Sequence, residues 1–136
     1  MATKTLCFVV QRPPYKSESS KLAITHAISS QTVEVYLEDD DMVEARLAFV
    51  GDGVLNCTDN QKATDHYGIV NITDHIKNAL LSDIRVLVCK EDLEKYGLSE
   101  DSVPDAEEMG ADINPEIVSF DEILKEMESA DHLLFF

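Results

Sequence analysis

Three cysteines, Cys7, Cys57 and Cys89, are the side chains of this sequence best suited to covalent chemistry. Their number is odd, they lie far apart in the chain and no C-x-x-C pair occurs, which favours a reducing compartment over a disulfide framework. A thiol becomes a strong nucleophile only where its surroundings stabilise the thiolate. Each cysteine is therefore judged by the segment that holds it.

Cys89 has the most favourable position of the three. It ends an apolar run that begins at Ile84, and a segment with a helical pattern follows directly. The unpaired amides and the dipole at a helix start stabilise a thiolate. Lys90 adds positive charge there, whereas Glu91 and Asp92 compete for the same amides. Cys89 is the first candidate nucleophile, and a cysteine at the edge of the core without a chemical role is the alternative.

The other two cysteines are weaker candidates. Cys7 lies within an apolar run, where a free cysteine behaves as a small buried hydrophobic residue, so we expect its thiolate to be less available than that of Cys89. Cys57 lies in a polar segment just after a glycine turn, and we expect it to reach solvent. It is the second candidate, although no neighbour in the sequence is clearly placed to activate it.

Two further patterns could bind ligands. The turn Gly51–Gly53 could cradle a phosphate, but it lacks the spacing of a dinucleotide fingerprint and the G-K-[ST] signature, and a tight turn explains it equally well. The four histidines show no metal-ligand spacing. A grouping of Cys57 and His66 with Asp59 or Asp65 would rest on a polar loop. We therefore expect no metal site.

Composition and charge exclude several classes of partner. The chain of 136 residues has 27 acidic against 11 basic side chains and a formal charge of −16, and no basic patch is visible. Direct binding of nucleic acid would meet repulsion. No apolar run approaches the roughly 20 residues of a membrane helix, and the N-terminus has no signal-peptide pattern. We expect a cytoplasmic protein with one domain, residues 1–136, that contacts no membrane.

Strands alternate with helices along most of the chain. The apolar runs that we expect to be buried strands are Thr5–Val10, Ala45–Val50, Ile84–Cys89 and His132–Phe136. Helices are expected after the serines at 17–20, after Thr73, in Glu91–Tyr96 and after the capping box of Ser119 and Glu122. This order predicts an α/β fold, a mostly parallel sheet with helices on both faces.

Three segments give less regular patterns. Alternation from Thr32 to Glu38 predicts one more, half-exposed strand. Residues 54–72 are expected to form a loop with a short helix, and Ser99–Ala111 an acidic loop. In parallel sheets the functional positions lie at the carboxyl ends of the strands, here after Val10, at the glycine turn and at Cys89.

The sequence resembles the DsrE/DsrF-like sulfur-relay family, most closely its DsrF/TusC branch, over nearly the whole chain. Four landmarks carry the resemblance: Pro13-Pro14-Tyr15, Phe49-Val50-Gly51-Asp52-Gly53-Val54, Val86–Leu93 leading to Tyr96-Gly97-Leu98, and the C-terminal Met127–Phe136. The resemblance implies a flavodoxin-like subunit without a cofactor. Its partners would be related DsrE/DsrH-like subunits or a second copy of itself, together with sulfur donor and acceptor proteins.

The resemblance leaves two functions open. In DsrE/TusD members a cysteine at the end of the corresponding strand carries sulfur as a persulfide, which would make Cys89 the carrier of a sulfurtransferase. DsrF/TusC members generally lack that cysteine, which would make this chain a non-catalytic subunit of a DsrEFH/TusBCD-like complex. Similar relay subunits serve sulfur oxidation and tRNA thiolation, so the pathway stays open as well.

Overall fold

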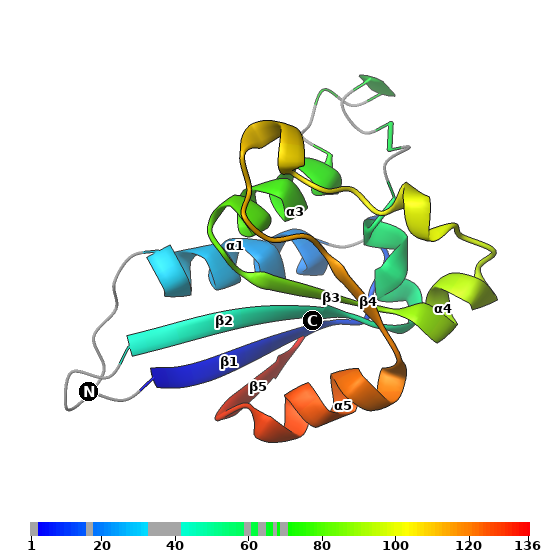
Figure 1. The fold of residues 1–136 in the computed structure, drawn as a ribbon. Helices are drawn as coiled ribbons and strands as arrows, with labels where there is room; N and C mark the ends of the chain where they lie inside the picture. Colours follow the sequence, from blue (N-terminus) through cyan, green and yellow to red (C-terminus); the bar gives the residue numbers. More distant parts are fainter. Residues whose placement is uncertain are drawn as a thin grey trace.

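A computed structural model of the 136-residue chain describes residues 3–15, 18–32, 42–58, 61–62, 65–66, 68 and 71–136. Its centre is a five-stranded sheet in the order β4-β3-β2-β1-β5, and every neighbouring pair runs parallel (Figure 1). The strands are β1 (Thr3–Val10), β2 (Met42–Phe49), β3 (Arg85–Cys89), β4 (Glu116–Val118) and β5 (His132–Phe135). The flavodoxin-like α/β fold predicted from the sequence is confirmed.

Helices cover both faces of this sheet. Figure 1 shows α1 (Ser19–Thr32) and α3 (Ile72–Leu81) above the strands and α5 (Phe120–Ser129) below them. The short α4 (Lys90–Lys95) continues directly from β3, and the 3₁₀ helices are η2 (Gly51–Asn56), η3 (Glu100–Ser102) and η4 (Glu107–Met109). The predicted cap of α5 is present, because the Ser119 hydroxyl accepts a hydrogen bond from the Glu122 N–H at 3.3 Å.

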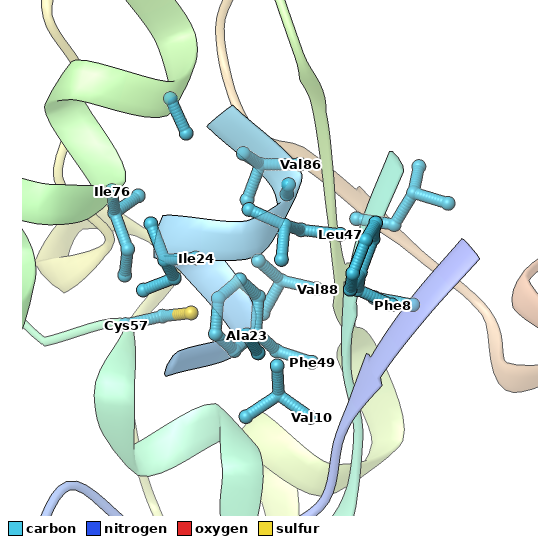
Figure 2. Packing of buried hydrophobic residues seen from close by; sticks show 14 of the residues in the cluster. Phe8, Val10, Ala23, Ile24, Leu47, Phe49, Cys57, Ile76, Val86 and Val88 are labelled. Carbon is cyan, nitrogen blue, oxygen red and sulfur yellow. The ribbon is translucent and has the colours of Figure 1, made fainter. Parts of the chain in front are cut away.

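The carboxyl-terminal parts of the three central strands are mostly buried, as their apolar runs predicted. Toward α1 and α3 they present Phe8, Val10, Leu47, Phe49, Val86 and Val88, which pack against Ala23, Ile24 and Ile76 (Figure 2). The opposite face is more mixed, since Arg46 and Arg85 lie beside buried residues such as Cys7 and Leu87. The core therefore fixes the strands whose carboxyl ends form the candidate site.

β4 was not predicted from the sequence, and the acidic stretch is more regular than expected. β4 has three residues and pairs with the outer side of β3, so it is too short to give a periodic signal. The expected acidic loop Ser99–Ala111 contains η3 and η4, and its Pro104 and Ala106 are buried. A few small apolar residues thus pack this stretch against the hydrophobic core despite its charge.

Two other predictions fall partly outside the described residues. Thr32 is the last residue of α1, and the rest of the strand expected at 32–38 lies outside the described part of the chain. In the segment 54–72, η2 covers only the first residues, Asp65 and His66 are helical, and several residues between 59 and 70 lie outside the described part of the chain. Among the described residues no helix has the length and apolar content needed to cross a bilayer.

Candidate functional site

The carboxyl ends of β1, β2 and β3 lie side by side in the middle of the sheet. Val10 is in register with Phe49, and Phe49 with Val88, so the three strands end at one level. The loop after β1, the turn that starts η2 and the junction of β3 with α4 therefore meet at one edge. The three positions singled out from the sequence are brought together as expected.

The glycine turn is built into the end of β1. The Val50 N–H donates to the Val10 carbonyl at 3.1 Å, and a Cβ atom on Gly53 would lie 2.0 Å from that same oxygen. Only glycine allows this approach without displacing the backbone. The side-chain amide of Asn56, which is fully buried, donates to the carbonyls of Arg12 and Gly53 at 2.8 and 2.9 Å. The turn after β2 is thus fastened to the loop after β1.

The amides of Gly51 and Gly53 in this turn are hydrogen-bonded within the protein. The Gly53 N–H donates to the Val50 carbonyl at 2.9 Å, and the Gly51 N–H donates to the Asp92 carboxylate at 2.7 Å. A phosphate cradle needs such groups to point at the ligand. The turn therefore joins the ends of β1 and β2, and its hydrogen-bonded amides argue against a phosphate-binding site there.

Cys89 lies at the centre of this edge but does not face solvent. It is the N-cap residue of α4, its side chain makes no capping hydrogen bond, and it is only 1% exposed. Burial raises the pKa of its thiol to about 11; interaction with the Asp92 backbone N–H lowers it, whereas the carboxylates of Asp92 and Glu91 raise it. The helix is six residues long, so its dipole is small.

The expected advantage of Cys89 over Cys7 is therefore wrong for the free chain. Cys7 is fully buried, and burial raises the pKa of its thiol also to about 11, with Arg46 lowering it and Glu126 raising it. The helix start after Cys89 was expected to stabilise the thiolate. The two carboxylates that follow Cys89 and its complete burial outweigh that effect.

Cys57 was expected to reach solvent, and this is also wrong. It is fully buried, and Figure 2 shows its sulfur pointing into the apolar cluster between α1, α3 and the sheet. Burial raises the pKa of this thiol strongly. The polar neighbours of Cys57 in the sequence gave no sign that η2 turns this side chain inward.

The first turn of α4 clasps two neighbouring segments. The Asp92 carboxylate accepts the Gly51 N–H, and the Glu91 carboxylate accepts the Phe120 N–H at the start of α5 at 2.9 Å. The Tyr96 hydroxyl, one turn further along, is hydrogen-bonded to the Asp52 carboxylate. Sequence reasoning read both acids as competitors for the amides of their own helix. Hydrogen bonds between segments that are distant in the sequence cannot be predicted from the local spacing of residues.

An ionic network lies between α5 and the sheet, on the same face of the sheet as Cys7. Glu126 of α5 bridges Arg46 and Arg85, at 3.1 Å from the latter, and Arg85 also pairs with Glu116 at 2.9 Å. The network fixes α5 to β2, β3 and β4. Because each charge is used by a partner within the network, we read it as structural.

No metal site is found among the described residues, since no three histidine, cysteine or acidic side chains are placed to hold an ion. The grouping of Cys57 with His66 does not form either. Cys57 is buried and His66 is exposed, while Asp59 lies outside the described part of the chain.

Comparisons with solved structures show the same fold. The crystal structure of the ychN protein from E. coli is 23% identical, covers 98% of this chain and 99% of its own, and superposes with a TM-score of 0.72. The protein of unknown function MTH1491 from Methanobacterium thermoautotrophicum gives 12% identity, 98% and 99% coverage and a TM-score of 0.62.

A third solved structure, the conserved protein of unknown function BT1422 from Bacteroides thetaiotaomicron, is 14% identical with a TM-score of 0.55 and covers 96% of this chain and 94% of its own. No curated protein matches the sequence. The profile of the DsrE/DsrF-like family matches residues 4–136, which include all three cysteines and every described strand apart from the first residue of β1. The chain belongs to the DsrE/DsrF-like family.

Proposed function

We propose that this chain is a cytoplasmic sulfur-relay subunit that accepts and passes on persulfide sulfur at Cys89. The observation that carries the proposal is the position of Cys89, at the end of a central strand and at the edge of the sheet where the segments after β1, β2 and β3 meet. Family membership supports a sulfur-relay role. Of the three cysteines, Cys7 lies within β1 and Cys57 points into the core, so Cys89 needs the least rearrangement to meet a donor.

The proposed step needs no external oxidant. The Cys89 thiolate attacks the terminal sulfur of a donor persulfide, the S–S bond of the donor breaks, and the donor leaves as a thiolate. The new bond joins Cys89 Sγ to the transferred sulfur, so one S–S bond forms as another breaks. The reverse reaction with an acceptor thiolate passes the sulfur on. Because Cys89 is buried in the free chain, both steps require its exposure during the encounter.

The partner surface that we propose lies on β5 and α5. β5 is the outer strand of the sheet, and it carries no lysine, arginine or proline to protect its free edge. Its Leu133 and Phe135 are exposed, as are Phe120 and Leu124 of α5. Exposed apolar side chains on neighbouring elements are typical of a protein interface. We propose that a related subunit or a second copy of the chain covers this surface.

A specific observation favours the second candidate, a non-catalytic subunit of the DsrF/TusC kind. Its basis is that Cys89 is buried and burial raises its pKa, so the isolated chain holds the thiol protonated and away from solvent. In this case the β5 and α5 surface would be the functional part, and Cys89 would be a core residue. The two candidates differ in whether sulfur is ever bound to Cys89.

A sulfur-loading experiment separates the two candidates. The chain is incubated with a persulfide donor, such as a cysteine desulfurase and cysteine, and its intact mass is measured. We expect a gain of one sulfur atom that is lost in Cys89→Ser and kept in Cys7→Ser, with far-UV circular dichroism as the check that both variants fold. If a related subunit gains sulfur under the same conditions and this chain does not, the carrier proposal fails.

A further inference from the structure

The outer edge of β5 presents backbone groups that point away from the sheet. Within the described part of the chain, β1 is the only strand that pairs with β5. The Phe136 N–H donates to the Val9 carbonyl and the Phe136 carbonyl accepts from the Gln11 N–H, both at 2.8 Å. Backbone polar groups alternate sides along a strand, and the register of β5 with β1 is continuous. The N–H and C=O groups of Phe135 and Leu133 therefore face outward.

This edge is held in place at both ends of β5. Before the strand, the Asp131 N–H donates to the Thr5 carbonyl at 3.0 Å, and the Asp131 carboxylate accepts the Thr5 N–H at 2.8 Å. After the strand, Phe136 is bonded to β1, and its ring stacks on Phe8 with the ring centroids 6.0 Å apart. An edge that is already ordered loses little conformational entropy when another strand pairs with it.

The side chains of β5 are apolar and open to solvent on both faces of the sheet. Leu133 and Phe135 lie on one face and are 41% and 57% exposed, whereas Leu134 lies on the other face and is 36% exposed. The strand contains no acidic residue, lysine or arginine, so the edge carries none of the formal charge of −16. An uncharged apolar edge of this kind is suited to pairing with another strand.

The opposite edge of the sheet is protected against such pairing. β4 has three residues, follows Pro115 directly and begins with the charged Glu116. The acidic side chains of Glu100, Asp105 and Glu107 line a hollow next to this strand. A short strand, a proline and nearby charge all keep a sheet edge from pairing. A head-to-tail contact between β5 and the β4 of a second copy is therefore disfavoured, which leaves β5 to pair with β5 in a closed dimer.

We propose that two copies of the chain form a dimer by antiparallel pairing of β5 with β5, with Leu134 on the twofold axis. In this register Leu133 of one copy lies opposite Phe135 of the second copy, so each outward N–H meets an outward carbonyl. Parallel order around a twofold axis would instead set each N–H opposite the same N–H of the second copy. The inference rests on the partner surface of the proposed function and names its occupant.

Disulfide trapping tests the register of this pairing. Residues opposite each other in a non-hydrogen-bonded antiparallel pair have Cα atoms about 4.5 Å apart, which a disulfide can bridge. Leu134→Cys should therefore give a disulfide-linked dimer with diamide on a non-reducing gel. Leu133→Cys is the matched control, because its two copies would lie about 8 Å apart, beyond the reach of a disulfide. The native cysteines are buried, so the unsubstituted chain should not be linked.

Proline substitution tests the backbone hydrogen bonds. The Leu133 N–H points away from β1, so Leu133→Pro removes a donor of the outer edge and leaves the bonds to β1 in place. We expect this variant to be monomeric by sedimentation velocity at a concentration at which the wild type is dimeric, with an unchanged far-UV circular dichroism spectrum. Leu133→Ala keeps the N–H and loses only side-chain contact, so it should still dimerise, but more weakly.

Four results would overturn the inference. They are a wild type that stays monomeric at high micromolar concentration, equal cross-linking of Leu134→Cys and Leu133→Cys, cross-linking of Leu134→Cys only to a related subunit, and wild-type association of Leu133→Pro. If Phe135→Asp blocks association while Leu134→Cys does not cross-link, the partner surface stands and the β5 dimer fails. Sulfur loading of Cys89 is measured separately, so the carrier proposal and the dimer can be refuted independently.

Discussion

Replacement of Gly53 by alanine tests how tightly the site is built into the sheet. The added Cβ atom would lie 2.0 Å from the Val10 carbonyl oxygen, 2.8 Å from the Val10 carbonyl carbon and 3.3 Å from the Gln11 nitrogen. Non-bonded heavy atoms are most stable at a separation of about 3.5 Å. All three neighbours are backbone atoms, and the carbonyl is held by the Val50 N–H, so no side-chain rotation can relieve the overlap.

We expect Gly53→Ala to lower the free energy of unfolding by about 3 kcal/mol or more, the upper end of the cost of overpacking, because β1 or η2 must shift. Gly97→Ala is the matched control. Gly97 has a φ of +68°, but a Cβ atom there meets nothing within 4 Å, so its cost should be only about 1 kcal/mol of backbone strain.

Urea unfolding followed by circular dichroism measures both values. The slope of the unfolding free energy against urea concentration should be the same in the wild type and the two variants. If Gly53→Ala costs no more than Gly97→Ala, the close contact between η2 and β1 is absent. The description of the three strand ends as one packed edge of the sheet would then be wrong.

The remaining predictions concern the ionic network, the buried thiols and the partner surface. Glu126→Ala leaves two arginines without their shared carboxylate and should cost about 2 kcal/mol in urea unfolding, while exposed Glu128→Ala should cost less than about 0.5 kcal/mol. Because burial raises the pKa of Cys7 to about 11, the folded state holds this proton more tightly than the unfolded state. That stabilisation is complete below the unfolded pKa near 9 and is lost as pH rises toward 11, so the contribution of Cys7 alone should fall by about 2 kcal/mol between pH 8 and 10.5, and Cys7→Ala should remove this part of the loss. Phe135→Asp should abolish association measured by sedimentation velocity, whereas Leu22→Asp, an exposed site on α1, should not; equal effects of both would contradict the proposed surface.

The fold was predictable from the sequence because the carboxyl-terminal parts of its central strands are mostly buried. Continuous apolar runs such as Thr5–Val10 and Ile84–Cys89 have few alternatives to a parallel strand, and β1 and β3 appear where they were expected. The capping box at Ser119 was equally local and equally reliable. β4 was missed because three residues on the rim of a sheet carry too little pattern.

The candidate site was only partly predictable, for a different physical reason. The position of Cys89 at a strand end follows from local pattern, but its burial depends on η2 and α4, which meet only in the folded chain. Cys57 shows the same limit, since polar neighbours in the sequence do not reveal a side chain that turns into the core. Local spacing gives the place of a thiol, and tertiary packing sets its exposure and its pKa.

The most direct test of the central claim is the location of sulfur in the unsubstituted chain. After incubation with a persulfide donor, the protein is digested and the peptides that contain Cys7, Cys57 and Cys89 are compared by mass spectrometry. We predict that added sulfur is found on the Cys89 peptide, at a level several times that on either other cysteine. Sulfur on Cys57 or Cys7, with Cys89 unmodified, would contradict the assignment of Cys89 as the carrier.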